Sequence, residues 1–526
     1  MKILFVYPNV EGYGRIPLGM SLIMTILKNA GHTLELFDVT FIVQDKNLDN
    51  KARESFKTVK STNTDYLYNY HTLNEIDELF ASRIKKFKPD IVAFSIVEDN
   101  YRYAHRLLKL TKSLYPGLAT IVGGSTPTIA AEVLIKNPYI DYLIKGEAEL
   151  AMAEFCAAWD KGEDLRLTQG LWYKQEGKVY SNQLGPLINL DELPIQDLDF
   201  WDDAHFIKPY DGKVYRTGSI EMSRGCPQKC TYCINETLRN TYYESGNKLI
   251  RKKTVINTVR EAKYLKEKHN LELFFFCDDN FLALTRKKME EFKKLWKKEV
   301  NTPFWINTTI ESVTDWRLAA LLECGCVGIG IGVESGNEWF RKHVLKRGRG
   351  NENHMLLEKF DLIKKYGIRV SSNAMFGFPG ETLADMYETI KLIKTINPPA
   401  SSLFFVAPYI GTPIHLLAKD QGLIDCRTED GFKGMAYEIG VRRGPMIRNN
   451  GVSNEIMNGL VRDFIDYVEG RLPIPDEFVC ESSGASVTAD KRMESLEEAA
   501  FIDGIFVEAE AKKDMIRNAR KINKVV

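Results

Sequence analysis

The 526-residue sequence has no surplus of either charge, because its 71 lysines and arginines are matched by 71 aspartates and glutamates. A nucleic-acid-binding surface needs basic groups to meet phosphate, so this balance argues against nucleic acid as the main partner. The sequence also lacks an apolar run near the roughly 18 residues that cross a bilayer, and we expect no transmembrane segment. No small-residue cleavage site follows the start, Met1–Tyr7, which indicates a strand rather than a signal peptide.

Paired cysteines are lacking as well. The nine cysteines are odd in number and have no paired spacing, which argues against a secreted disulfide scaffold and favours a reduced, cytoplasmic protein. There is no internal repeat and no low-complexity segment. The 44% hydrophobic and 11% aromatic content is enough for several buried cores. The length favours two to four domains of about 150 residues each.

Residues 1–150 alternate short apolar runs with amphipathic stretches, the pattern of a parallel sheet covered by helices. This predicts a doubly wound, Rossmann-like domain. We expect its strands at Lys2–Tyr7, Thr33–Asp38, Asp90–Ile96, Ala119–Val122 and Tyr142–Lys145, and helices at Leu18–Asn29 and Arg102–Leu114. Residues 151–215, with one helix and a hairpin around Lys174–Gly177, are interpreted as a linker because they are rich in Asp and Pro.

A second series of strands and helices occupies residues 216–419. The expected strands are Gly218–Met222, Leu273–Asp278, Phe304–Thr308, Val327–Val333, Val370–Met375 and Ser402–Ala407. Six such units predict a partial (βα)6 barrel with an open side rather than a closed eight-stranded barrel. The strand pattern fades after about residue 420, so residues 420–526 are predicted to be a mostly helical capping region.

The strongest chemical signal is a cysteine triplet, Cys226, Cys230 and Cys233, directly after a predicted strand. Three thiolates on one tight loop can hold three irons of a [4Fe–4S] cluster and leave the fourth iron for a small molecule. A structural zinc site takes four protein ligands, and no fourth Cys or His lies at finger spacing. The other six cysteines, including the Cys324-Gly325-Cys326 pair, are interpreted as core or surface residues.

With Tyr232 before its third cysteine, this triplet resembles the radical SAM superfamily. Four later segments strengthen the resemblance, and each lies at the C-terminal end of a predicted strand: Phe276–Phe281, Gly330–Gly336, Gly377–Thr382 and Pro408–Pro413. The resemblance implies that these segments bind S-adenosylmethionine (SAM). The implied SAM-binding residues are Tyr232, Asp278, Asp279, Asn307, Glu334, Gly377, Phe378, Pro379 and Tyr409.

Each segment also has a purely structural interpretation. Gly-Phe-Pro-Gly can be only a turn, and Glu334 can be an ion-pair partner within the barrel. One departure from the family concerns the third strand, after which many relatives carry an arginine near the SAM carboxylate. Here the sequence reads Asn307–Glu311, and the substitute cation is Arg347 or Arg349, unless the contact is absent.

Residues 1–150 resemble the cobalamin-binding domain that precedes the barrel in one radical SAM class. The resemblance rests on Pro17–Met20, Ala30–His32, Phe94–Val97, Val122–Pro127 and Lys145–Glu149. The implied cobalamin-binding residues are Leu18, Gly19, Ser95, Val97, Gly123, Gly124, Ser125, Gly146 and Glu147. The alternative is a purely structural domain that has the same glycine turns and binds no cofactor.

No Asp-x-His-x-x-Gly sequence supplies an axial histidine for cobalamin. His32 is interpreted as a residue of the turn after a helix, and the Asp203-Ala204-His205 sequence as a coincidence.

The two resemblances together imply a methyltransferase that acts on an unactivated carbon, or on phosphorus. It would use a 5′-deoxyadenosyl radical and methylcobalamin, with a reductant such as flavodoxin or ferredoxin and a small-molecule or lipid-precursor substrate. One alternative is a cyclase, oxidative rearrangement or carbon–carbon coupling enzyme of the same architecture, and another is a non-catalytic cobalamin or redox sensor. Tyr409, Trp339 and Met435–Arg443 are candidates for the substrate-binding wall, and no catalytic residue is assigned.

Overall fold

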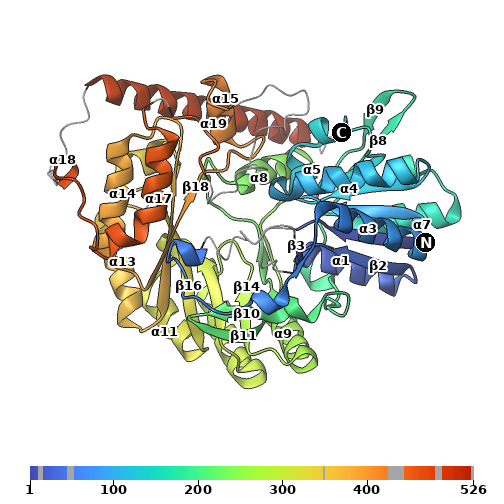
Figure 1. Ribbon diagram of the computed structural model, residues 1–526, viewed down its shortest axis with the longest axis horizontal. Coiled ribbons are helices and arrows are strands. Elements are labelled where there is room, and N and C mark those ends of the chain that lie inside the picture. Colours follow the sequence, from blue (N-terminus) through green and yellow to red (C-terminus); the bar gives the residue numbers. More distant parts are fainter. Residues whose placement is uncertain are drawn as a thin grey trace.

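The computed structural model describes residues 1–9, 16–43, 53–347, 350–424, 444–449, 451–479 and 489–522. Two seven-stranded sheets form its framework. Figure 1 shows the first sheet and its helices at the right and the second sheet at the lower centre, with the long helix α19 along the top.

The first sheet has the strand order β2-β1-β5-β6-β7-β8-β9. Its bounds are β1 Lys2–Tyr7, β2 Thr33–Asp38, β5 Ile91–Ser95, β6 Ala119–Gly123, β7 Tyr142–Ile144, β8 Leu171–Gln175 and β9 Lys178–Ser181. The first five strands are parallel. Because β2 and β5 flank β1 on opposite sides, the crevice at the carboxyl ends of β1 and β5 is the topological switch point, where such sheets bind ligands.

Helices cover both faces of this sheet, which confirms the doubly wound prediction. Their bounds are α1 Leu18–Asn29, α3 Leu73–Phe87, α4 Tyr101–Leu114, α5 Ser125–Ile129, α6 Ala131–Leu134 and α7 Glu149–Lys161. Alternate residues of β1 point to opposite faces, as the two-residue period of a strand requires. Ile3 and Phe5 lie in the core beneath α1 and α7, whereas Leu4 and Val6 lie in the core beneath α3 and α4.

The segment predicted as a linker takes part in both sheets. Strands β8 and β9 form the expected hairpin, but β8 pairs antiparallel with β7 and so extends the first sheet. Further along, β10 (Ile207–Tyr210) pairs antiparallel with β11 of the second sheet. The Asp- and Pro-rich composition indicated the turns, whereas these pairings depend on strands far away in the sequence.

The second sheet has the order β10-β11-β14-β15-β16-β17-β18. Its parallel strands are β11 Lys213–Ile220, β14 Leu273–Phe276, β15 Phe304–Thr308, β16 Cys326–Glu334, β17 Arg369–Phe376 and β18 Ala400–Phe405. No pairing within the described ranges joins β18 to β11, so the sheet curls without closing. The prediction of a six-unit partial barrel is confirmed.

Helices alternate with these strands and continue into the C-terminal region. Those within the barrel are α8 Ile234–Glu244, α9 Val255–His269, α10 Arg286–Leu295, α11 Asp315–Glu323, α12 Glu338–His343, α13 Asn353–Lys365, α14 Leu383–Ile396 and α15 Pro413–Asp420. The C-terminal helices are α17 Asn454–Val468, α18 Asp476–Val479 and α19 Ala489–Ile522. Helix α17 packs on α14, and α19 packs on α8 and α15. Among the described helices, none combines the length and apolar character that a membrane span needs.

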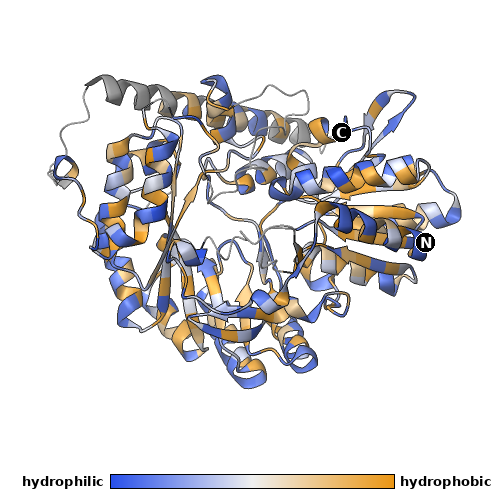
Figure 2. Ribbon diagram, in the orientation of Figure 1, coloured by the Kyte–Doolittle hydropathy of each residue, from blue (hydrophilic) through white to orange (hydrophobic). Residues whose placement is uncertain are grey.

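One hydrophobic core runs from the first sheet into the second. It contains Ile3 of β1, Trp201 of the connecting segment and Phe276 of β14. The Trp201 indole also donates to the Ser21 hydroxyl on α1 at 2.9 Å. Figure 2 shows hydrophobic residues concentrated on the strands and on the inner sides of the helices.

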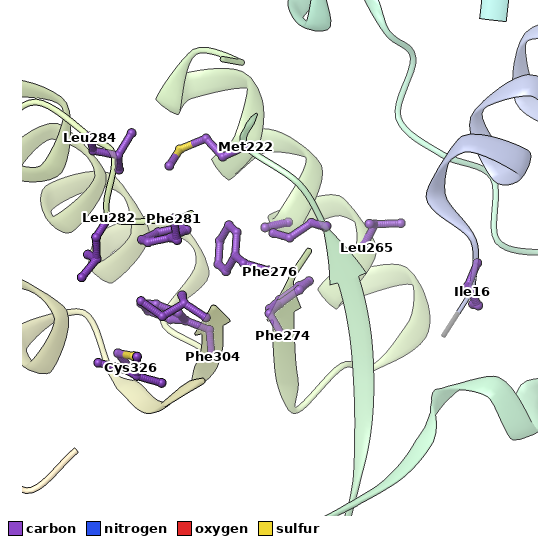
Figure 3. Packing of buried hydrophobic residues seen from close by; sticks show 14 of the residues in the cluster. Ile16, Met222, Leu265, Phe274, Phe276, Phe281, Leu282, Leu284, Phe304 and Cys326 are labelled. Carbon is purple, nitrogen blue, oxygen red and sulfur yellow. The ribbon is translucent and has the colours of Figure 1, made fainter. Parts of the chain in front are cut away.

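The densest part of this core is aromatic. Phe276 packs against Phe281, Phe292, Trp296 and Phe304, with ring centroids 4.7 to 5.8 Å apart. Figure 3 shows the side chains of Phe274, Phe276, Phe281 and Phe304 gathered close together beside the strands of the second sheet.

We expect Phe276→Ala to lower the free energy of unfolding by about 3–5 kcal/mol, the usual cost of emptying a packed aromatic site. Urea unfolding followed by near-ultraviolet circular dichroism measures the change. The control is Leu322→Ala on α11, whose side chain is half exposed, with an expected change within about 0.5 kcal/mol. Equal unfolding midpoints for the two variants would contradict the packing described.

Candidate functional site

The cysteine triplet lies on a loop that follows the short strand β12 (Ser223–Arg224) and leads into α8. Backbone hydrogen bonds fix this loop, since Thr231 donates to Leu345 and Ile414 donates to Thr231. Cys226 and Cys230 are buried, and Cys233 is half-buried. Burial raises the pKa of Cys226 to about 11 and that of Cys233 to about 12. Iron binding would deprotonate these thiols, as metal coordination generally does.

A buried arginine lies beside this loop. Arg347 is 8% exposed, and its Nη1 atom is 3.7 Å from the Cys230 sulfur and 3.5 Å from the Tyr232 hydroxyl. Its Nη2 atom donates to the Gly332 carbonyl at 2.7 Å. The Glu334 carboxylate lies 3.9 Å from its Nη1 atom. The other candidate cation, Arg349, lies outside the described residues.

This environment fits a [4Fe–4S] cluster with a small anionic ligand. A cation this deeply buried needs nearby negative charge. Three cysteine thiolates and a ligand carboxylate would add to the charge that Glu334 and Glu311 already supply. Within the described ranges, no three His, Cys, Asp or Glu side chains are gathered as around a single metal ion.

The two aspartates after β14 form hydrogen bonds with residues on both sides of the cysteine triplet. Asp278 is 1% exposed and accepts from the Met222 amide at 3.0 Å and the Ser223 hydroxyl at 2.5 Å. Asp279 accepts from the Gly225 amide at 3.1 Å and from Asn235 at 2.9 Å. Both aspartates therefore shape the cysteine loop, and Asp279 also lines a cavity.

Asp278 is expected to make the protein less stable as pH rises from about 4 to about 7. Burial raises its pKa from 3.8 to about 7, so within this window the folded protein keeps a proton that the unfolded chain has lost. Above this window the cost of ionising the buried carboxyl is fully present, and below it both states are protonated.

In Asp278→Asn this contribution is absent. The free energy of unfolding of the variant minus that of the parent should therefore increase between about pH 5 and about pH 8. Urea unfolding at both pH values measures the difference, and a difference independent of pH would contradict the assignment.

Glu334 ends β16 with a φ of 71°, a left-handed conformation that is uncommon outside glycine, where the pairing with β17 shifts register. A Cβ atom on Gly332 would lie 2.0 Å from the Glu334 carboxylate, so any other residue there would displace the Glu334 side chain. A Cβ on Gly330 would lie 2.4 Å from the Asn307 side chain. The two glycines thus leave room for the side chains of Asn307 and Glu334 at the strand ends. Burial raises the pKa of Glu334, and Arg347 opposes that effect.

The turn after β17 is closed by its own carboxylate. Glu381 accepts from the amides of Gly377 at 2.7 Å and Phe378 at 3.2 Å. The Phe378 ring is fully buried in a core cluster with Phe340, and Pro379 is buried as well. The Phe378 ring thus has a packing role, so any contribution of the turn to ligand binding comes from its backbone.

Tyr409 follows β18 and lies at the junction with the first sheet. Burial raises its pKa, and the nearby carboxylates of Asp99 and Glu98 contribute to that rise. The next residue, Ile410, donates its amide to the buried Glu98 carboxylate at 3.4 Å. The carboxyl ends of β18 and β5 therefore meet.

The residues implied in cobalamin binding all lie at the carboxyl edge of the first sheet or at the start of α1. They are Leu18 and Gly19 of α1, Ser95 at the end of β5 and Val97 after it, Gly123 at the end of β6 with Gly124 and Ser125 after it, and Gly146 and Glu147 after β7. A Cβ atom would meet nothing within 4 Å on Gly19 or Gly123, but on Gly124 it would lie 2.5 Å from the Ile96 carbonyl. Gly19 and Gly123 thus border open space at this edge of the sheet, which leaves room for a large planar ligand.

The remaining candidates have other surroundings. His32 contacts the N-terminal amine and Asp160. His205 is buried and pairs with Asp38 at 2.5 Å. Trp339 stacks on His343 within α12. The segment Met435–Arg443 lies outside the described residues.

Sequence reasoning missed Arg224, a residue that joins the two halves of the molecule. A cavity of about 260 Å³ is lined from one side by Ser125 and Glu147 and from the other by Arg224, Cys277 and Asp279. Arg224, just before the first cysteine of the triplet, contacts Glu147 and Glu149 of the first half. A lone arginine beside a glycine gives no sequence signal for such a contact.

Comparisons with known proteins agree with this geometry. Residues 10–156 match the family model of the B12 binding domain, and residues 220–393 match that of the Radical SAM superfamily.

Three curated relatives have low sequence identity to this chain, and each matches it over more than half of its length. An uncharacterized methyltransferase of Pyrococcus horikoshii is 26% identical over 63% of this chain and 70% of its own length. The anaerobic magnesium-protoporphyrin IX monomethyl ester cyclase of Rubrivivax gelatinosus is 24% identical over 78% and 68%. Cytidylyl-2-hydroxyethylphosphonate methyltransferase of Streptomyces wedmorensis is 23% identical over 85% and 86%.

Among solved structures, the radical S-adenosylmethionine methyltransferase TsrM of Kitasatospora setae, with cobalamin and a [4Fe–4S] cluster bound, superposes with a TM-score of 0.62. It is 14% identical, and the match covers 99% of each chain. The two chains share a fold along their whole length.

Proposed function

We propose that this protein is a cobalamin-dependent radical SAM methyltransferase, because residues 220–393 match the Radical SAM superfamily and residues 10–156 match the B12 binding domain. The observation that carries the proposal is that the carboxyl edges of the two sheets face each other. Glu98 after β5 binds the Ile410 amide after β18, and Glu147 after β7 pairs with Arg224 beside the cysteine loop. Two of the three curated relatives compared are named methyltransferases.

In this proposal the barrel holds the cluster and SAM. Cys226, Cys230 and Cys233 bind the cluster, and Arg347 supplies the cation for the SAM carboxylate. The proposed SAM-binding set is Tyr232, Asp278, Asp279, Asn307, Glu334, Gly377, Phe378, Pro379 and Tyr409. Within this set, Asp278 contributes indirectly, because its hydrogen bonds hold Met222 and Ser223 in place. Phe378 contributes through its backbone and through the packing of its ring on Phe340.

The first half holds cobalamin at the switch point. The proposed set is Leu18, Gly19, Ser95, Val97, Gly123, Gly124, Ser125, Gly146 and Glu147. When bound, the three cofactors supply an electron, a substrate-activating radical and a transferable methyl group. The protein's own residues orient these groups, and the loops at the two carboxyl edges shield the space between them from water.

The substrate is a small molecule, and the enzyme needs a reductant. We further propose methyl transfer to an unactivated carbon or to phosphorus, with a flavodoxin or ferredoxin as electron donor. A relative that acts on a nucleotide-linked phosphonate, according to its name, supports a small polar acceptor; a lipid precursor is the other class proposed.

The test is anaerobic reconstitution with iron, sulfide and hydroxocobalamin, followed by dithionite and SAM deuterated in its methyl group. We expect near-stoichiometric cobalamin after gel filtration, S-adenosylhomocysteine with the label on cobalamin, and 5′-deoxyadenosine. Formation of 5′-deoxyadenosine alone would instead support a reaction without methyl transfer, such as that of the related cyclase. A protein that never cleaves SAM would overturn both readings and indicate a sensor.

A further inference from the structure

The loop that follows β7 is held by residues of the second half. The Glu147 amide donates to the Tyr242 hydroxyl on α8 at 2.7 Å. At Gly146, whose φ is 100°, a Cβ atom would lie 2.9 Å from the Leu184 side chain and 3.1 Å from the Tyr242 hydroxyl. The glycine therefore allows α8, the helix that begins at the last cysteine of the triplet, to approach this loop.

A buried arginine, Arg224, connects the same loop to the cysteine loop. Arg224 is mostly buried, and its Nη1 atom lies 2.7 Å from a Glu149 oxygen and 3.2 Å from a Glu147 oxygen. Its Nε and Nη2 atoms bind Glu221 at 2.8 Å. Arg251 also pairs with Glu147.

The geometry of this cluster can fix the distance between the two loops, which an isolated ion pair cannot do. The planar guanidinium binds carboxylates along two edges at once, which a lysine ammonium cannot do. One residue, Gly225, separates Arg224 from Cys226, so a displacement of Arg224 would also move the cysteine loop. The cavity shared by the two halves is bordered by Glu147, Glu221 and Arg224. A shift of this cluster would therefore change the spacing across that cavity.

We propose that Arg224 is a positioning residue that fixes the cysteine loop relative to the cobalamin-binding half. Through this spacing it sets how efficiently SAM bound in the barrel reaches cobalamin. The inference rests on the proposed function. It assigns to Arg224, with Glu147, Glu149 and Tyr242, a role outside the cofactor-binding sets named above for the barrel.

The test separates the two products of SAM in the reconstituted protein with dithionite. Formation of 5′-deoxyadenosine needs only the barrel, whereas S-adenosylhomocysteine needs both halves in register. For Arg224→Met we expect 5′-deoxyadenosine to stay within about threefold of the parent and the ratio of S-adenosylhomocysteine to 5′-deoxyadenosine to fall at least about tenfold, since small misplacements have effects of this size. Arg224→Lys should recover only part of the ratio.

A second readout uses the protein without cofactors. Hydrogen–deuterium exchange of the 142–150 peptide should accelerate in Arg224→Met and in Tyr242→Phe. The matched control is Arg462→Met, since Arg462 is exposed and pairs only with its neighbour Asp463 among its described contacts, and it should change neither readout.

Parallel loss of both products, or unchanged exchange in the 142–150 peptide, would overturn the proposal. If Arg224→Met does not fold, Tyr242→Phe decides in the same way, with an expected fall in the ratio and an unchanged ratio as the contradicting result. A parent protein that forms no S-adenosylhomocysteine would instead refute the proposed function, while the exchange data would still test the contact.

Discussion

Replacing Cys230 by alanine is expected to prevent cluster assembly and to lower the rate of SAM cleavage at least about a thousandfold, equal to about 4 kcal/mol of activation free energy. Cys230 is the middle cysteine of the triplet and faces the buried Arg347 guanidinium. Two remaining thiolates cannot hold three irons. Iron and sulfide content after anaerobic reconstitution, with 5′-deoxyadenosine formation, measures the loss.

Cys156→Ala provides the matched control. Cys156 is fully buried on α7, in the first half of the molecule, so its loss removes a core thiol without touching the cysteine loop. We expect a full complement of iron in this variant. A Cys230→Ala protein with the same iron content as the control would show that the loop is not the cluster site.

Replacing Arg347 by methionine is expected to raise the Kd for SAM at least about 30-fold, because losing one partner of a buried charge pair costs about 2–5 kcal/mol. Methionine keeps much of the volume and removes the charge. Arg347→Lys keeps the charge without the planar fork, so its Kd should lie between the two. Equilibrium dialysis with labelled SAM on the reconstituted protein gives the values.

The iron content separates this outcome from a loss of the cluster. Arg347 supplies no iron ligand, so Arg347→Met should retain the iron of the parent protein. An unchanged Kd for SAM at full iron content would place the carboxylate-binding cation elsewhere in the chain.

Much of the framework was predictable because local patterns determine it. The strands Lys2–Tyr7 and Phe304–Thr308 have the predicted bounds, since each is a short apolar run between turn residues. The hairpin within the expected linker was also located correctly. Its place in the first sheet was not, because the pairing of Tyr142 with Tyr173 is a long-range contact that no local pattern encodes.

The site divides in a similar way. The cysteine spacing and the glycine turns predict which loops gather at the strand ends, but not where each side chain points. Asp278 turns inward because the Met222 amide and the Ser223 hydroxyl need an acceptor. Phe378 fills the core beside Phe340 because a large apolar ring is stabilised there. The contacts of Arg224 join segments that only the folded chain brings together.

The shared core also limits how this protein can be divided or recombined. A fragment ending at residue 150 would leave the β7 edge without β8, whose Leu171 is fully buried, and an exposed edge strand promotes aggregation. A fragment ending after Ser181 keeps the sheet but still lacks Trp201, which packs under α1. A graft of this cobalamin-binding half onto another barrel would therefore have to include the connecting segment, to about Tyr210. The new barrel would also need the surface residues on which that segment packs.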